Sequence, residues 1–194
     1  MRTAKVERKT KETAISINLN LDGTGIYDIS TGIGFFDHML ELFSKHSLVD
    51  LNVKCSGDLN VDEHHTVEDV GLVLGEAILK ALGDKKGIYR YGFLLPMDEV
   101  LAEVALDISG RSYLVWNAEF KREKIGEMPT ELFEDFFIAV SDSLRANLHI
   151  SMRYGRNEHH MAEGIFKAFA KALRFAVAPD ERAKDLLPST KGKL

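Results

Sequence analysis

The stretch DEHHTVEDVGLVLGEAIL at residues 62–79 returns as NEHHMAEGIFKAFAKALR at residues 157–174. The two copies align without a gap at a constant offset of 95 residues. The alignment pairs His64 with His159, His65 with His160 and Glu68 with Glu163. Apolar or small residues match downstream of these polar ones, so the repeat extends beyond the polar motif into a helix.

The similarity continues on both sides of this motif. Upstream, FFDHMLELF at 35–43 matches LFEDFFIAV at 132–140, and LNV at 51–53 matches LHI at 148–150. A two-copy repeat of this length is too long for a solenoid unit and indicates a duplicated small domain. We therefore expect two similar halves, residues 1–90 and 91–194, packed as one compact body.

Alternating residues predict the first strands of each half. Apolar and polar side chains alternate over residues 13–21, which predicts a half-buried strand, and DGTG at 22–25 predicts a hairpin turn after it. Residues 104–108 alternate in the same way before Ser109-Gly110. Both halves are thus expected to begin with strands.

Helical spacing follows in each half. Residues 35–46 carry apolar side chains at helical spacing, and LVDLNVKC at 48–55 predicts a short strand. The next helix is expected to open at the double histidine and to end at Gly83, and its second copy to end near Pro179. The predicted order is strand, strand, helix, strand, helix, in an α+β or mixed α/β fold with helices over one face of each sheet.

Composition limits the class of protein. The 194 residues are 45% hydrophobic and 28% charged, which excludes a disordered chain, and the net charge of −5 argues against a general nucleic-acid surface. Cys55 is the single cysteine, so no intrachain disulfide can form and a reducing compartment is favoured. No apolar run reaches the length of a membrane helix, and the N-terminus lacks a signal-peptide core. We expect a cytoplasmic enzyme or ligand-binding protein with no membrane partner.

The double histidines are candidate metal ligands. Asp62 and Asn157 stand where helix N-caps belong, which places each pair in the first helical turn. Adjacent helical residues diverge by about 100°, so two neighbouring histidines cannot easily chelate one ion. Glu68 lies at i+4 from His64 and i+3 from His65, and can share an ion with either. Two metal ions are therefore predicted, and the imidazole and carboxylate donors suit Mn, Fe, Co, Ni or Zn.

The repeat supports one of the other histidines as a metal ligand and gives no support to two more. His38 pairs with Asp135, and since both are ligand types, both are candidates. His46 pairs with Ser143 and His149 with Asn52, so neither gains support from the repeat.

These motifs resemble a known family. DEHHTVED and NEHHMAEG, together with GFFDHML, SGRSYL, LHI and PSTKGKL, are similar to the imidazoleglycerol-phosphate dehydratases over essentially the whole chain. The resemblance implies dehydration of imidazole glycerol phosphate to imidazole acetol phosphate in histidine biosynthesis, by the monofunctional form of the enzyme. It also implies two Mn(II) ions per active site and helices packed between two four-stranded sheets. Trimers that assemble into a 24-subunit particle, with active sites shared between subunits, are implied as well.

The resemblance assigns roles to particular residues. It implies eight metal ligands, four per ion: His38, His64, His65, Glu68, Asp135, His159, His160 and Glu163. Many family members have histidine where this chain has Asp135, so the aspartate binds directly or through a water. It implies a substrate-binding set: Glu12, His38, His46, Arg90, Arg111, Lys167, Ser189, Thr190 and Lys191. Of these, the arginines and the C-terminal residues would meet the phosphate.

A dehydration also needs a group that moves protons. Glu12 is the candidate that the resemblance provides, with Asp98 and Glu99 as the alternative, and Glu68 and Glu163 are counted as catalytic with it. Two other readings stay open at this point. The metal ions could only hold an oligomer together, or the chain could be a metal-dependent hydrolase.

Overall fold

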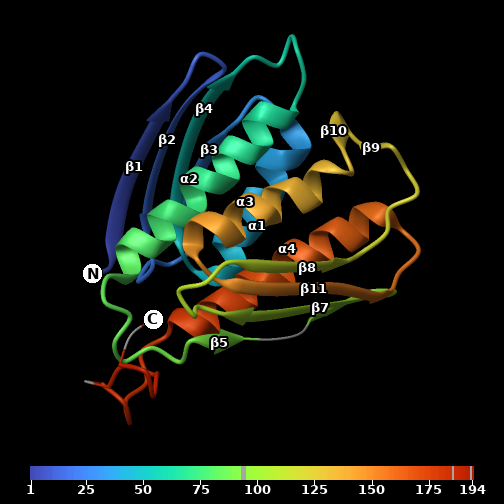
Figure 1. Ribbon diagram of the computed structural model, residues 1–194. Helices are drawn as coiled ribbons and strands as arrows, with labels where there is room; N and C mark the ends of the chain where they lie inside the picture. The colour runs from blue at the N-terminus through green and yellow to red at the C-terminus, as the bar shows by residue number, and fades with distance from the viewer. Residues whose placement is uncertain (93–94, 185, 193) are drawn as a thin grey trace.

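Four helices form a central layer between two β-sheets in the computed structural model (Figure 1). The structure describes residues 1–92, 95–184, 186–192 and 194. The helices are α1 (Gly34–Ser47), α2 (His64–Leu82), α3 (Leu132–Leu144) and α4 (Glu158–Val177). No helix within these ranges is long and apolar enough to cross a bilayer.

The first sheet comes from the N-terminal part of the chain. Its strands run in the order β1 (Thr3–Lys9), β2 (Thr13–Asn20), β4 (Asp50–Gly57) and β3 (Tyr27–Ser30). β1, β2 and β4 pair antiparallel, and β3 joins β4 in parallel, so the sheet is mixed.

The second sheet has a similar topology. β7 (Val100–Asp107) and β11 (Asn147–Tyr154) are antiparallel neighbours, and β8 (Tyr113–Asn117) joins β11 in parallel. Two short segments, β5 (Tyr91–Gly92) and β6 (Leu95–Met97), pair one after the other along the free edge of β7 and together fill the fourth position. A small hairpin of β9 (Lys124–Ile125) and β10 (Met128–Pro129) lies outside the sheet. The predicted α+β fold with two four-stranded mixed sheets is confirmed.

The core lies where the helices meet each other and the sheets. On β2 the alternation works as predicted, because Ile15, Ile17 and Leu19 are buried against the helices. Between the helices, Phe36, from α1, meets Phe136, from α3, edge to face with ring centroids 5.4 Å apart. α1 packs on α4, and α2 packs on α3.

The crossing of α2 and α3 is unusually close. A Cβ atom at Gly71 would lie 2.9 Å from the Phe136 carbonyl oxygen, and one at Gly75 would lie 2.8 Å from the Val140 carbonyl oxygen. Glycine at these two positions lets the two backbones approach, and this approach brings the first turn of α2 alongside α3.

Two expectations about the strands are wrong. The DGTG turn does not make a hairpin, because β2 and β3 are not neighbours in the sheet. Asp50 accepts hydrogen bonds from the backbone N–H groups of Thr24 and Ile26, at 2.8 and 3.0 Å, and so guides the chain across to β4. The hairpin lies one connection earlier, between β1 and β2. The predicted order is also one strand short in each half, because three strand positions of the sheet, not two, precede the first helix.

Candidate metal centre

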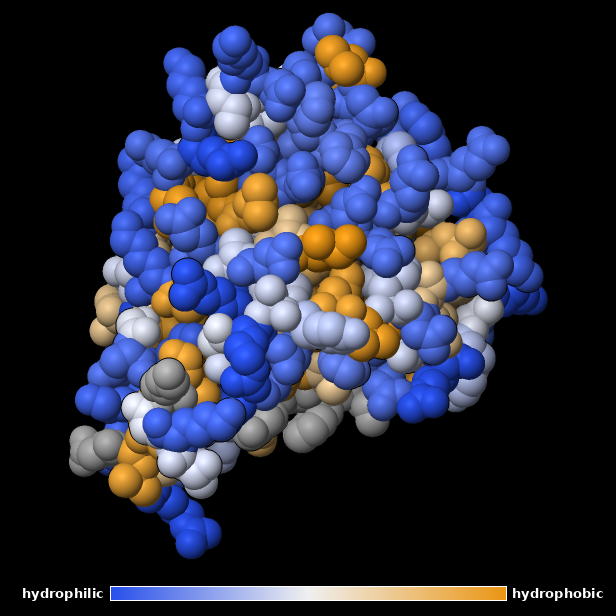
Figure 2. Space-filling model, in the orientation of Figure 1, coloured by the Kyte–Doolittle hydropathy of each residue, from blue (hydrophilic) through white to orange (hydrophobic). Residues whose placement is uncertain are grey.

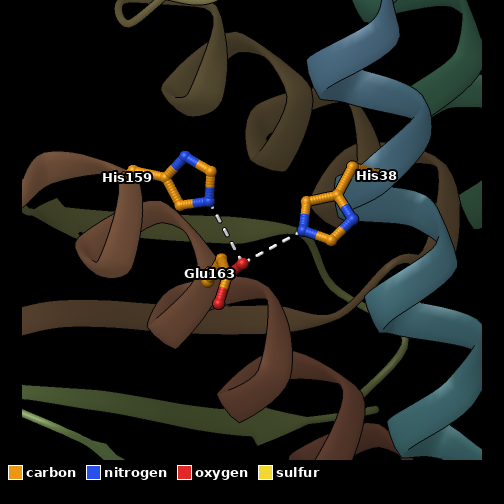
Figure 3. Close-up of side chains that lie close together, drawn as sticks. All are labelled: His38, His159 and Glu163. Carbon is orange, nitrogen blue, oxygen red and sulfur yellow. Dashed lines mark hydrogen bonds and ion pairs between the residues drawn. The ribbon is translucent and has the colours of Figure 1, made fainter.

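One cluster of ligand-type side chains joins α1 to α4. His38 projects from α1, and His159 and Glu163 project from the first turns of α4 (Figure 3). Glu163 Oε1 lies 3.0 Å from His38 Nε2 and 3.2 Å from His159 Nε2. One donor atom from each residue lies within 4.8 Å of the other two, which is close enough for all three to bind a single ion.

The charge of Glu163 is set by its neighbours. Burial opposes its ionisation, but hydrogen bonds from Lys167 and His38 outweigh burial and lower the pKa of Glu163 to about 2. Lys167 Nζ donates to Glu163 Oε2 at 2.7 Å. Glu163 is therefore a carboxylate at neutral pH, the form that binds a metal cation.

A second cluster joins α2 to α3 in the same way. His64 and Glu68 project from α2, and Asp135 projects from α3. His64 Nδ1 lies 3.4 Å from Asp135 Oδ2, and His64 Nε2 lies 3.8 Å from Glu68 Oε2. The two carboxylates face different nitrogens of one ring, so this cluster is more open than the first.

The second histidine of each pair faces away from its cluster. The rings of His64 and His65 have centroids 6.0 Å apart, and those of His159 and His160 lie 6.2 Å apart. This separation follows from their adjacent positions on a helix. Each helix therefore presents one histidine to the cluster and one to a different side.

Carboxylates orient these second histidines. Asp58 approaches His65 Nδ1 at 3.1 Å, and this hydrogen bond raises the pKa of His65. Glu99 Oε2 lies 3.0 Å from His160 Nδ1, and the bond lowers the pKa of Glu99 to about 2. A carboxylate on Nδ1 fixes the ring and leaves Nε2 as the nitrogen that could bind a metal ion.

Asx side chains hold the two helix starts. Asn157 is the N-cap of α4, and its Oδ1 accepts from His159 N at 3.0 Å. Asp62 Oδ1 accepts from His64 N at 2.7 Å, although the helix assignment places the N-cap of α2 at Glu63. The predicted capping residues thus bond to the expected backbone groups.

The predicted phosphate-binding residues gather elsewhere. A hollow of about 360 Å³ is lined by Arg90, Arg111, Pro188, Ser189, Thr190, Lys191 and Leu194. Arg90 donates to Asp107 through Nε and Nη2, and its Nη1 donates to the Pro188 carbonyl oxygen at 2.8 Å. The Arg90 backbone N–H bonds to Ala176 near the end of α4. The hollow therefore lies at the opposite end of α4 from the double histidine, a helix about 30 Å long.

His46 and Lys167 lie on the cluster side. His46 is half-buried, and burial together with the charge of Lys167 lowers its pKa. His149 is exposed on β11 and contributes to neither cluster.

Three residues beside the clusters were not predicted as their partners. Asp58 and Glu99 orient the second histidines, and Asp69 is 5% exposed on α2. Asp69 carried a signal, because it is a charged residue in an apolar helical run whose repeat counterpart is Gly164.

Comparison with known proteins gives consistent results. The family model described as imidazoleglycerol-phosphate dehydratase matches residues 31–173. The imidazoleglycerol-phosphate dehydratase of Clostridium acetobutylicum is 58% identical over 194 residues, covering 100% of this chain and 98% of that protein. The histidine biosynthesis bifunctional protein HisB of Spirosoma linguale is 62% identical over 193 residues, and the chain spans 50% of its length.

A solved structure agrees with these relatives. The crystal structure of imidazoleglycerol-phosphate dehydratase from Staphylococcus aureus subsp. aureus N315 superposes with a TM-score of 0.83 at 43% sequence identity. The match covers 91% of this chain and 99% of that one.

Proposed function

Because the chain belongs to the imidazoleglycerol-phosphate dehydratase family, we propose that its two clusters hold the metal ions used in that reaction. The chain is a lyase of histidine biosynthesis that removes water from imidazoleglycerol phosphate. The hydrolase reading and the purely structural reading of the metal ions therefore give way to a dehydratase. The observation that carries the proposal is the cluster of His38, His159 and Glu163, whose donor atoms are close enough to bind one ion. The repeat places Asp135, His64 and Glu68 at the corresponding positions, where they form a more open group.

The donor sets fit divalent transition metals. Each cluster offers imidazole nitrogen and carboxylate oxygen without thiolate, a mixture that suits Mn(II). We assign two Mn(II) ions per active site. When bound, these ions supply Lewis acidity that polarises the imidazole ring of the substrate.

A neighbouring copy completes each site in this proposal. Each cluster has three ligands from one chain, while His65 and His160 face outward with Nδ1 already held by Asp58 and Glu99. These histidines are the fourth ligands for clusters on adjacent subunits. The position of the hollow lined by Arg90 and Arg111 supports the same conclusion. It lies at the far end of α4 from His159 and Glu163, so one small substrate cannot reach both the hollow and this cluster of the same chain. Trimers assembled into a 24-subunit particle provide such shared sites, and a cytoplasmic location suits this biosynthetic enzyme.

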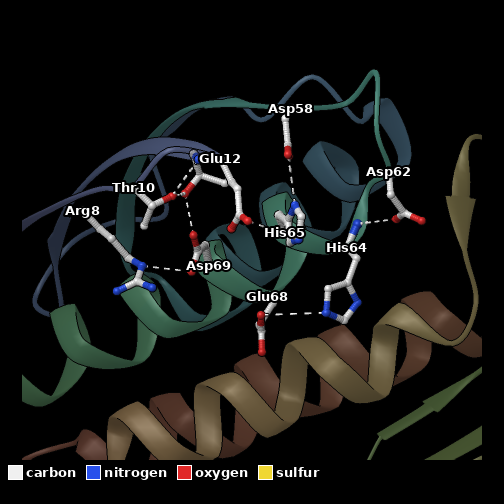
Figure 4. A network of polar contacts seen from close by, with 10 residues as sticks. Arg8, Thr10, Glu12, Asp58, Asp62, His64, His65, Glu68 and Asp69 are labelled. Atoms are coloured by element: carbon white, nitrogen blue, oxygen red, sulfur yellow. Dashed lines mark hydrogen bonds and ion pairs between the residues drawn. The ribbon is translucent and has the colours of Figure 1, made fainter.

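Glu12 is the group assigned to move protons. Its carboxylate is 52% exposed, and Oε1 lies 3.9 Å from His65 Nε2 (Figure 4). Of the alternative pair Asp98 and Glu99, Glu99 has both oxygens occupied, one by His160 and one by the Asn157 backbone N–H at 2.9 Å. Glu12 is therefore the freer base. Two of the proposed metal ligands, Glu68 and Glu163, place negative charge beside the imidazole ring of the substrate.

The remaining polar residues bind the substrate. Arg111, Ser189, Thr190 and Lys191 offer donors to the phosphate, and Arg90 holds the C-terminal segment that carries three of them. The imidazole ring of the bound substrate would be contacted by Lys167, His46 and His38.

His160→Ala tests the shared metal site. We expect kcat to fall about 100-fold or more and one of the two tightly bound ions to be lost, because a first-sphere donor is removed. His149→Ala is the matched control, since His149 is exposed on β11, and its activity should stay within about twofold of wild type. Turnover assays and elemental analysis measure both quantities. Full activity with two bound ions in His160→Ala contradicts the proposal.

A further inference from the structure

A buried carboxylate stands behind the turn that carries Glu12. Asp69 on α2 is 5% exposed and accepts hydrogen bonds on both oxygens (Figure 4). Arg8 Nε donates to Oδ1 at 2.9 Å, and the Thr13 hydroxyl donates to Oδ2 at 2.5 Å. Thr13 is itself 3% exposed, so this contact is shielded from water.

The hydrogen bonds continue from Thr13 to the backbone of Glu12. Thr10 Oγ1 accepts from the backbone N–H groups of Glu12 at 3.1 Å and Thr13 at 2.9 Å. Thr10 Oγ1 also lies 3.3 Å from Thr13 Oγ1. Because the Thr13 proton is donated to Asp69, Thr13 Oγ1 must be the acceptor in this contact and the Thr10 hydroxyl the donor.

Asp69 thus fixes the direction of the bond between the two threonine hydroxyls. The series runs from Glu12 N–H to Thr10, from Thr10 to Thr13, and from Thr13 to the carboxylate. Hydrogen bonds to an ionised acceptor are stronger than neutral ones, and a chain of them is mutually reinforcing. The turn is therefore tied to the helix that carries His65 and Glu68.

No such series is found among the residues of the second half that the structure describes. Gly164 occupies the position that corresponds to Asp69, and a Cβ there would lie 3.0 Å from Val100 Cγ1. The corresponding turn is held instead by Glu99, which bonds to His160 and to Asn157 N. The Asp69 series is present only behind the turn whose glutamate carboxylate accepts no hydrogen bond within the described part of the chain.

We infer that Asp69 and Thr13 are positioning residues that hold Glu12 against the metal-binding helix for proton transfer. This inference rests on the proposed role of Glu12. Neither residue touches the substrate; both act through the backbone of the turn. A displacement of about 1 Å at a reacting group can lower a rate about 100-fold, so this restraint affects kcat rather than substrate binding.

The test compares Thr13→Val with Thr13→Ser. Valine keeps the branching and removes the hydroxyl, whereas serine keeps the hydroxyl. In the metal-loaded enzyme, Thr13→Val should lower kcat about 10–100-fold with KM and metal content unchanged, and Thr13→Ser should stay near wild type. Hydrogen exchange provides a readout independent of activity, because the Glu12 and Thr13 amides should exchange faster in Thr13→Val only.

A double-mutant cycle with Glu12→Gln separates the possible failures. Once Glu12 is gone, adding Thr13→Val should cost no further activity. If the two losses add in full, or if Thr13→Val keeps wild-type kcat while Glu12→Gln is inactive, the positioning role is wrong and the role of Glu12 stands. If Glu12→Gln keeps wild-type kcat, the proposed role of Glu12 is itself wrong.

Asp69→Asn is the second variant, in case Thr13→Val does not fold. The amide retains the shape of the carboxylate but lacks its charge, and should give the same loss in kcat and faster exchange at Glu12 and Thr13. Wild-type kcat in Asp69→Asn would overturn the inference.

Discussion

Asp135 is the residue at which the two clusters differ. It occupies in the second cluster the place that His38 occupies in the first, and its Oδ2 lies 3.4 Å from His64 Nδ1. A carboxylate has a shorter reach than an imidazole and adds one negative charge to the site. Hard ions such as Mn(II) are favoured over Zn(II) by this exchange of nitrogen for oxygen.

Asp135→Ala should lose tight binding of one ion while the cluster at His38 keeps the other. The affinity for the lost ion should fall by more than about 100-fold, beyond the effect of an indirect contact. Asp135→His should restore binding, and Glu134→Ala, an exposed neighbour on the same helix, should behave as wild type. Elemental analysis and metal titration give the answer. Two ions bound with unchanged affinities in Asp135→Ala would remove this residue from the ligand set.

The packing of α2 against α3 constrains the geometry of the second cluster more than any other contact between elements described above. Gly71 and Gly75 allow the two backbones into close contact, whereas the corresponding positions on α4 are Phe166 and Ala170. The spacing of α2 from α3 also sets the separation of His64 from Asp135. Packing in this crossing therefore sets the geometry of the proposed metal site.

Gly75→Ala should destabilise the protein by about 1–3 kcal/mol, the usual cost of overpacking a core. The added Cβ would lie 2.8 Å from the Val140 carbonyl oxygen and 3.0 Å from the Leu144 nitrogen, so the helices must separate. Gly34→Ala is the control, because a Cβ there meets nothing within 4 Å. Thermal unfolding should show a midpoint several degrees lower for Gly75→Ala alone. Equal midpoints for the two variants would contradict this account of the crossing.

The elements differ in how much of them the sequence determines. α1, α2 and α4 are predicted from long apolar periodicities, with capping residues marking the starts of α2 and α4, and α3 is predicted from its match to α1 in the repeat. β3 has four residues, all exposed or half-buried, so no periodicity marks it. The double histidines were recognisable from the repeat, but Asp69 acts on Thr13 across 56 residues, and only the packed fold brings that pair together.

On the scale of the whole molecule, each cluster draws on both halves of the chain. His38 belongs to the first half and meets His159 and Glu163 of the second, while Asp135 of the second meets α2 of the first. The hollow lined by Arg90 and Arg111 lies at the far end of α4 from His159 and Glu163. The proposed parts of the active site therefore lie at separated points on the chain, an arrangement that fits the proposed assembly from several copies.

Removal of metal should abolish activity and break the assembly into smaller species. The proposed fourth ligands, His65 and His160, come from neighbouring subunits. In this proposal each ion therefore links two chains and also takes part in catalysis. Light scattering after exhaustive chelation should show a lower mass, and Mn(II) should restore both mass and turnover. An unchanged mass after complete removal of metal would refute the bridging ligands, and surviving turnover would refute the metal-dependent reaction.

The crossed pairing of helices, α1 on α4 and α2 on α3, constrains how such a chain could have arisen. Half of this chain alone would carry two helices with exposed apolar faces, and it would hold only part of each cluster. An ancestor of that length would have needed a second copy of itself to cover these faces. The resulting symmetric dimer would have had two identical clusters. Two copies joined in one gene would no longer have to stay identical. The two halves of this chain differ at such positions, with Asp135 opposite His38 and Asp69 opposite Gly164.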